Sequence, residues 1–105
     1  MNNNDLFGLK QRVDILVSEL QKIGPVMRGS VTEIGRENHK QAHFSVSIQG
    51  RTKLIYLGKK REKKAREYSQ NYKRLMEITQ EMTLLNMEIL KLEGQQDKSD
   101  VKQAQ

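Results

Sequence analysis

The stretch KKREKKAREYSQNYKRLMEITQEMTLLNMEILKL, residues 59–92, determines how the rest of the chain is interpreted. Apolar residues in its second half recur at alternating intervals of three and four, which is typical of a helix that packs along one partner helix. These residues are Leu75, Ile78, Met82, Leu85, Ile89 and Leu92. The stretch therefore predicts one long helix over residues 59–93 with a seam for a second helix.

A matching seam lies near the N-terminus. Asn4 or Asp5 can cap a helix there, and Gly24-Pro25 can end it, so we predict a helix over residues 5–23. Its apolar residues have the same spacing and are Leu6, Leu9, Val13, Leu16, Leu20 and Ile23. We expect the two helices to pack antiparallel, with a seam formed by Leu9, Val13, Leu16, Leu20, Leu75, Ile78, Met82, Leu85 and Ile89.

Residues 26–57 lose the helical period and gain β-branched residues and alternation, which predicts a small sheet. We expect strands over residues 26–34, 44–48 and 52–57, a polar loop over 36–41 and a turn over 49–51. The predicted fold class is α+β: an antiparallel two-helix coiled-coil hairpin with a three-stranded antiparallel sheet inserted between the helices.

The register of the predicted hairpin follows from its large apolar residues. Pairing Ile48 with Thr52 sets Val46 opposite Leu54 and Phe44 opposite Tyr56. We favour this register because it gathers the large apolar residues of that set on one face, whereas a slip by one residue would scatter them.

Length and composition limit the class of protein. The chain has 105 residues and no cysteine, which predicts one small domain over residues 1–93 without disulfides. Residues 94–105 are polar enough to form a disordered tail. No window approaches the roughly 18 apolar residues of a membrane span, and no signal peptide is visible. We therefore expect a cytoplasmic protein that does not contact membranes.

Positive charge is concentrated in the middle of the chain. The net charge is +6, but residues 51–74 hold ten Lys and Arg against two Glu, a net charge of +8. Such a cluster favours a polyanionic partner, whose binding releases counterions. The simpler interpretation is a solvated surface that confers solubility.

Catalytic and metal-binding patterns are weak. No nucleophile stands beside a base, and no glycine-rich phosphate loop is present, so we expect no enzyme and no cofactor. His39 and His43 lie four residues apart without a third ligand, so we predict a pair of loop histidines and not a zinc site.

The predicted nucleic-acid surface combines three groups: the start of the long helix, the polar face of the hairpin, and the basic residues around the first strand. Aromatic residues are few, which favours duplex DNA over single strands. The candidate residues are Arg28, Arg36, Lys40, Ser45, Ser47, Arg51, Lys53, Lys59, Lys60, Arg61, Lys63, Lys64 and Arg66.

A second, weaker apolar stripe widens the faces of both helices. It comprises Met76, Thr83, Met87 and Leu90 on the long helix, with Ile15 and Val17 on the first. Two such hairpins could form a four-helix bundle, so a homodimer is one expectation, and ordinary partial exposure of apolar residues is the other.

Several short motifs resemble a family of short prokaryotic proteins of unknown function that are associated with transposases. The similar elements are a Gly29-Ser30 opening strand, a hairpin with the turn Gly50-Arg51-Thr52-Lys53, and a long helix with Asn71-Tyr72-Lys73-Arg74-Leu75 followed by Leu85-Asn86. Many members carry cysteines after the first strand, where this chain has Gly35-Arg36-Glu37-Asn38-His39, so the resemblance implies no metal site here. More weakly, three strands followed by a basic helix resemble the arm-type DNA-binding domains of integrases.

These resemblances imply DNA of mobile elements as the target. The leading hypothesis is a DNA-binding accessory protein. One alternative is a protein-interaction module that recruits a recombinase or another complex through its heptad faces. Another is an RNA-binding assembly factor.

Overall fold

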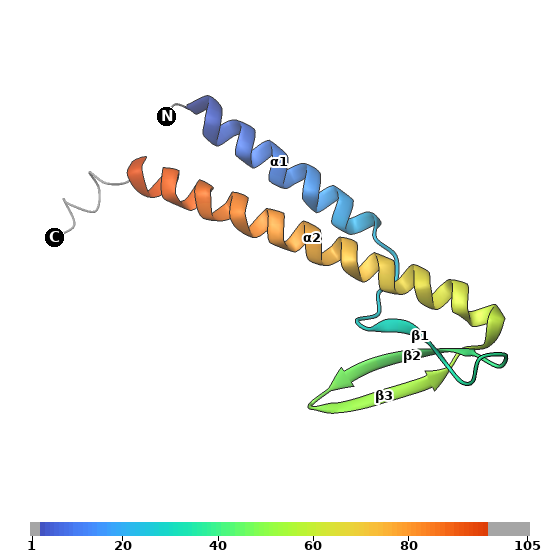
Figure 1. The fold of residues 1–105 in the computed structure, drawn as a ribbon. Coiled ribbons are helices and arrows are strands. Elements are labelled where there is room, and N and C mark those ends of the chain that lie inside the picture. The colour runs from blue at the N-terminus through green and yellow to red at the C-terminus, as the bar shows by residue number, and fades with distance from the viewer. Residues whose placement is uncertain (1–2, 97–105) are drawn as a thin grey trace. The chain divides into compact units, whose positions relative to one another are not determined.

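The structure, a computed structural model, describes residues 3–96 and contains two helices and one sheet (Figure 1). Its elements in chain order are α1 (Asn3–Lys22), β1 (Ser30–Ile34), β2 (Gln41–Ile48), β3 (Arg51–Tyr56) and α2 (Gly58–Gln96). The predicted α+β fold, with a three-stranded antiparallel sheet inserted between two helices, is confirmed.

The long helix α2 extends further than predicted at its C-terminal end. It starts at Gly58, whose φ of 69° ends the preceding extended segment, and it continues through Gly94 to Gln96. A glycine inside a helix costs only about 1 kcal/mol, and each added residue extends an existing helix easily. The predicted tail is therefore wrong for residues 94–96, and residues 97–105 lie outside the described part of the chain.

Contacts divide the chain into two compact units, and α2 contributes to both. The helical unit consists of the described parts of Met1–Lys22 and Met76–Gln105. The sheet unit consists of Ile23–Leu75, with the three strands and the first half of α2.

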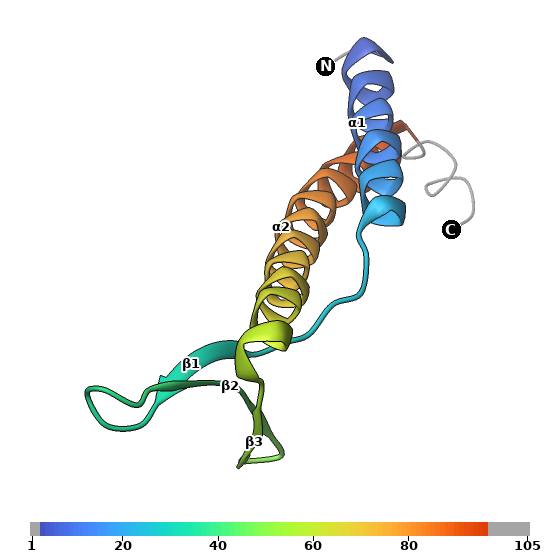
Figure 2. The same ribbon diagram turned by 90° about the vertical axis from the view of Figure 1, so that its right-hand side faces the viewer.

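In the helical unit, α1 lies alongside the second half of α2 (Figures 1 and 2). The heptad seam is the core, because Leu16 and Ile78 are 0% and 1% exposed. Ile89 and Leu92 are also buried, whereas Leu20 is 36% exposed near the end of α1. The other predicted seam residues are partly buried: Leu9, Val13, Met82 and Leu85 in this unit, and Leu75 in the sheet unit.

Ion pairs connect the two helices of this unit. Arg12 Nε lies 2.9 Å from Glu81 Oε2, and Lys10 Nζ lies 3.0 Å from Glu93 Oε2. The hydrogen bond to Glu81, reinforced by its charge, raises the pKa of Arg12. The later residue of α1 pairs with the earlier residue of α2, as antiparallel helices require.

In the sheet unit, β2 lies between β1 and β3, and both pairings are antiparallel. The β2–β3 hairpin pairs Ile48 with Arg51 across the two-residue turn Gln49–Gly50. Both turn residues have positive φ, 53° and 79°, as in the primed turns whose twist matches that of paired strands.

The predicted hairpin register is therefore wrong by one residue. Phe44 pairs with Ile55 and Val46 with Lys53, because the turn has two residues and not three. The large apolar residues are consequently divided between the two faces of the sheet. Leu54 and Tyr56 lie on the outer face and are about half exposed.

The inner face of the sheet forms the core of this unit. Ala42 and Phe44 from β2 pack with Leu57 and with Ala65 of α2, and all four are buried. Met27, Val31 and Val46 pack around them. The register dictates this composition, since alternate residues of β2 face the helix.

Strand limits differ from the prediction at all three strands, and β3 spans Arg51–Tyr56 instead of residues 52–57. The first strand begins at Ser30 and not at residue 26, because residues 27–29 form hydrogen bonds with α2 instead of with the sheet. Met27 N donates to Tyr68 O at 3.1 Å, and Ser69 Oγ donates to Gly29 O at 2.9 Å. The second strand begins at Gln41, within the predicted loop.

Over residues 3–96, neither helix contains an apolar stretch of the length and hydrophobicity that a bilayer crossing requires.

Candidate nucleic-acid interface

The first half of α2 has two unlike faces. Ala65 and Ser69 point toward the sheet and are 3% and 9% exposed. With 3.6 residues per turn, residues about half a turn from these two, such as Lys63, Glu67 and Arg74, fall on the opposite side of the helix. That side is positively charged, and the structure describes all of it.

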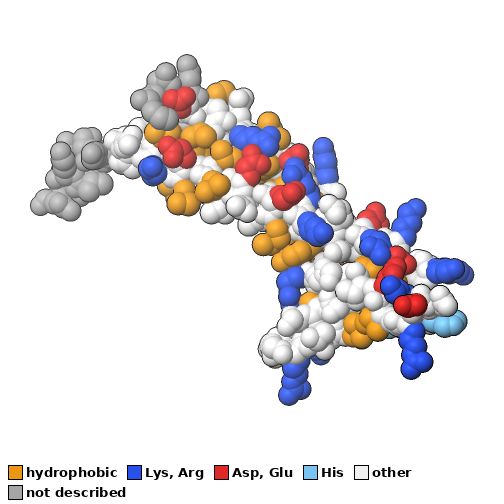
Figure 3. Space-filling view, in the orientation of Figure 1, with side chains coloured by type: hydrophobic (Ala, Val, Ile, Leu, Met, Phe, Trp, Pro, Cys, Tyr) orange, Lys and Arg blue, Asp and Glu red, His pale blue; other side chains and the backbone are white. Residues whose placement is uncertain are grey.

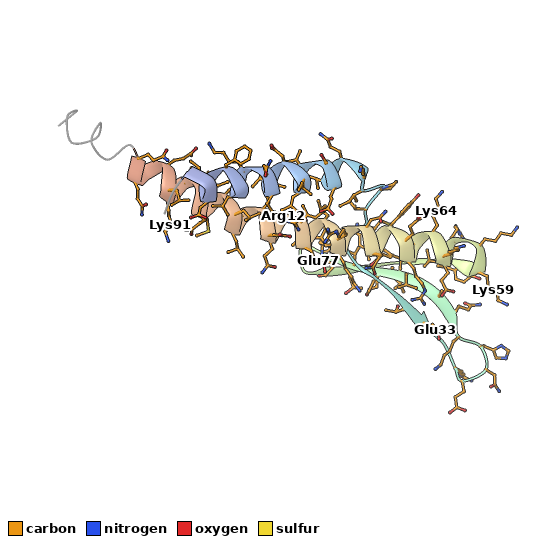
Figure 4. The ribbon with its side chains drawn as sticks, turned by 90° about the horizontal axis from the view of Figure 1, so that it is seen from above. Arg12, Glu33, Lys59, Lys64, Glu77 and Lys91 are labelled. Carbon is orange, nitrogen blue, oxygen red and sulfur yellow. The ribbon has the colours of Figure 1, made fainter. Side chains whose placement is uncertain are left out.

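We define the basic face of α2 as seven exposed Lys and Arg side chains, with one acidic residue, Glu67, among them. From its first to its last residue the face is about 22 Å long at 1.5 Å per residue. Lys59 and Lys64 extend from the first turns of α2 (Figure 4), and Figure 3 shows Lys and Arg side chains gathered over this half of the helix. The members are Lys59, Lys60, Lys63, Lys64, Arg66, Lys73 and Arg74.

Two adjoining depressions mark this face. One lies along α2 and is lined by Lys60, Lys63, Lys64, Arg66, Glu67 and Gln70. The other lies between α2 and β1 and is lined by Ser30, Val31, Arg66, Ser69, Gln70 and Lys73. Arg66 and Gln70 belong to both, and the second has no acidic residue in its lining, which makes it a suitable place for a phosphate group.

Local contacts hold part of the basic face in place. Arg66 Nε lies 2.9 Å from Glu62 Oε2, one turn earlier in α2. Lys64 Nζ lies 5.9 Å from the centre of the Tyr68 ring, within the range of a cation–π contact. These contacts fix the positions of Arg66 and Lys64 along the helix.

Arg61 has a different role from the one predicted. Its Nε donates to Leu57 O at 2.8 Å and the bond is partly buried. The guanidinium thus satisfies a carbonyl at the strand-to-helix junction, so we assign Arg61 to the fold and not to the binding surface.

The start of α2 opposes the usual electrostatics of helices. A helix N-terminus carries a partial positive charge and is stabilised by acidic residues. The first turn of α2 has no acidic residue and contains Lys59, Lys60 and Arg61. Natural proteins tolerate such conflicts at functional sites, and a bound anion would relieve this one.

The predicted binding residues of the hairpin do not lie together. Ser45 and Ser47 lie on the outer face of the sheet, whereas Arg51 and Lys53 pair with Ile48 and Val46 and lie on the inner-face side. The corrected register causes this separation. We therefore do not retain the hairpin as one polar contact surface.

The remaining predicted residues surround β1 and β2. Arg28 donates from Nη2 to Ser47 O at 2.7 Å, which ties it to β2. Arg36 is exposed in the β1–β2 connection, where His39 N donates to its carbonyl at 2.8 Å. Lys40 and Lys59 line a cavity of about 340 Å³ together with two carboxylates, Glu33 and Glu62, so this cavity has no excess positive charge.

Two members of the basic face were missing from the predicted set. Lys73 and Arg74 lie outside the dense run of charge that ends at Arg66. The 3.6-residue period, counted from Lys59, would have placed both on the same face. The angular position of each residue around the helix could therefore have identified Lys73 and Arg74, but the prediction relied on the density of charge along the sequence.

Within residues 3–96, no group of three His, Asp or Glu side chains is arranged to hold a metal ion. His43 Nδ1 lies 3.0 Å from Gln41 O, and the His43 ring contacts the Tyr56 ring edge-on at 5.6 Å between centroids. His43 therefore lies in β2 and not in a loop as predicted, whereas His39 lies in the β1–β2 connection.

Comparisons with protein-family models, with curated proteins and with solved structures found no match. The inference of function therefore depends on the charge and geometry of the basic face.

Proposed function

We propose that this protein is a non-enzymatic nucleic-acid-binding accessory protein that contacts duplex DNA through the basic face of α2. One observation carries the proposal: seven cationic side chains are exposed along the first half of α2, with one carboxylate among them. Lys60, Lys63 and Arg74 lie on the side away from the sheet. Arg66 and Lys73 lie at the edge beside β1. This arrangement is stronger support than net charge, because it concentrates the cations on one continuous surface.

The dimensions suit a duplex. The face is about 22 Å long, roughly two thirds of a helical turn of B-DNA. A helix fits the major groove, and long Lys and Arg side chains reach the phosphates on either side of it. The free amides at the start of α2 offer a further phosphate contact beside Lys59 and Lys60.

The resemblance to transposase-associated proteins supports DNA of mobile elements as the target. In this role the protein binds DNA and catalyses no reaction itself.

A salt titration of binding tests this proposal. Affinities for duplex DNA, duplex RNA and single strands are measured over a range of salt concentrations. We expect the steepest dependence for duplex DNA, with a log–log slope of about −0.9 for each neutralised phosphate. Lys60→Ala and Lys63→Ala should each reduce the slope by about one, with similar losses across DNA sequences.

Lys22→Ala is the matched control, because Lys22 is an exposed lysine in the last turn of α1 and lies outside the basic face. It should leave the slope unchanged. If the two α2 variants bind duplex DNA at low salt with the same affinity as the unmodified protein, the proposal is wrong. A steeper slope for duplex RNA would favour the RNA-binding alternative.

A second candidate function is an adapter that recruits another protein through the helical unit. Exposed apolar residues on α2 favour it, including Leu84 and Leu90, which are 60% and 67% exposed. This candidate predicts a complex with a partner protein whose affinity changes neither on addition of nucleic acid nor in the Lys60→Ala variant. Such a result would support it over DNA binding.

A further inference from the structure

The helical unit leaves one uncharged stripe of α2 uncovered. The stripe consists of Met76, Gln80, Thr83, Met87 and Leu90, whose intervals of four and three are heptad spacing. It lies on the side of the helix away from the seam with α1. Met76, Met87 and Leu90 are 49%, 57% and 67% exposed, so α1 does not cover them.

A line of three residues borders this stripe. Glu77, Leu84 and Lys91 are seven residues apart, which is about two helical turns, so they share one edge of the stripe. Glu77 and Lys91 can be followed along α2 in Figure 4. Leu84 is 60% exposed between them.

We infer that the stripe and its border form the contact surface for a second copy of this chain, with the two α2 helices antiparallel about a two-fold axis at Leu84. The contact is independent of the proposed DNA binding, because it uses a different half of α2.

The positions of the charged residues favour a second copy of the chain as the partner at this surface. A two-fold axis at Leu84 brings the two Leu84 side chains together and sets Glu77 of each copy level with Lys91 of the other. Both charged residues are seven positions from the axis, so the symmetric contact forms two opposite-charge pairs. Both residues already have contacts in their own chain: Lys91 lies 3.8 Å from Glu88, and Glu77 also has an interaction within the chain. Both side chains are exposed, so the pairs across the axis form in addition to these contacts.

A parallel arrangement does not offer these contacts. In a parallel pair, each border residue would face the other edge of the partner stripe, which carries the polar residues Thr79 and Asn86. Leu84 would then have no apolar partner, and Glu77 would not meet Lys91. The pattern of charges therefore favours the antiparallel pair.

The composition of the stripe predicts a weak dimer. Apolar residues occupy its ends, but Gln80 and Thr83 occupy its centre, where a strong coiled coil would carry leucine or isoleucine. We therefore expect association that depends on concentration, with an apparent mass that rises from 12.2 kDa toward twice that value.

Charge exchange tests the contact in the full-length chain, without nucleic acid. Glu77→Lys or Lys91→Glu alone should raise the dimer dissociation constant by roughly tenfold, since each creates two like-charge pairs. The double variant should restore association to near the original value, which a general effect of charge on solubility would not do. Leu84→Lys should abolish the dimer, and Phe7→Lys is its control, because Phe7 is 62% exposed on α1 and outside the contact.

Cysteine cross-linking tests the orientation, and the chain contains no native cysteine to interfere. A short bismaleimide should link Leu84→Cys chains efficiently, because the axis passes between them. It should fail with Leu90→Cys, since two residues that are each six positions from the axis are separated by about 18 Å.

Three outcomes would overturn the inference. One is a chain that stays monomeric at high concentration, which would leave the stripe to a different partner. Another is a double charge variant that does not recover association. The third is efficient linking of Leu90→Cys with none of Leu84→Cys, which would indicate a parallel contact.

Discussion

Replacement of Leu16 by alanine is the most direct test of the helical unit. Leu16 is 0% exposed and faces the seam against α2. The substitution removes the equivalent of three buried methyl or methylene groups, about 2.4 kcal/mol of transfer free energy, and leaves a cavity that α1 and α2 cannot fully close. We expect a loss of about 3 to 4 kcal/mol in the free energy of unfolding, a large share of the roughly 5 to 15 kcal/mol that small proteins possess.

Leu20→Ala is the matched control, since it makes the same chemical change at a seam position that is 36% exposed. It should cost only about 1 to 1.5 kcal/mol, because less apolar surface is returned to water. Urea unfolding followed by circular dichroism at 222 nm measures both values. Equal losses for the two variants would contradict the assignment of Leu16 to the centre of the seam.

Three further predictions concern the interface and the backbone. Glu67→Gln removes the one carboxylate from the basic face and should raise duplex DNA affinity by about two- to fivefold, as measured by fluorescence anisotropy. Gly29→Ala should destabilise the sheet unit by more than about 2 kcal/mol, because φ is +147° and the added Cβ would lie 2.6 Å from Ser45 O; tyrosine fluorescence reports this loss, since all three tyrosines belong to that unit. Gly94→Ala has open space around its Cβ within α2 and should instead stabilise the helix by about 0.5 to 1 kcal/mol in thermal unfolding.

The helices could be predicted from the sequence because a long heptad pattern has few other solutions. Six apolar positions on each helix, with the same intervals, specify a packed pair even though the sheet separates them in the chain. The confirmed fold class follows from that repetition and from the change of period between residues 24 and 58.

The hairpin register could not be predicted, because it depends on the conformation of one residue. Gln49 adopts a φ of 53°, which is uncommon for a residue other than glycine, and this allows the two-residue turn. The pattern of apolar residues favoured the other register, because that interpretation assumed that one face of β3 is buried. In the structure every residue of β3 is exposed. The actual register places Leu54 and Tyr56 on the outer face of the sheet.

The candidate site was predicted in part. The sequence identified the charged start of α2, and the structure places most of those side chains on one face. The structure also separates the predicted hairpin residues onto two faces of the sheet. It shows Arg61 bonded to the Leu57 carbonyl, and it adds Lys73 and Arg74 to the basic face. Position along the chain was therefore a good guide to where charge lies, and a poor guide to which charges act together.

The exposure of β3 has a consequence for solubility. All six of its residues, Arg51–Tyr56, are exposed, and the strand forms one edge of the sheet. An open edge with isoleucine and leucine side chains invites pairing with other chains, and natural proteins prevent this with charged residues on the edge strand. Arg51 and Lys53 are placed to do so, which gives them a protective role against aggregation that needs no ligand.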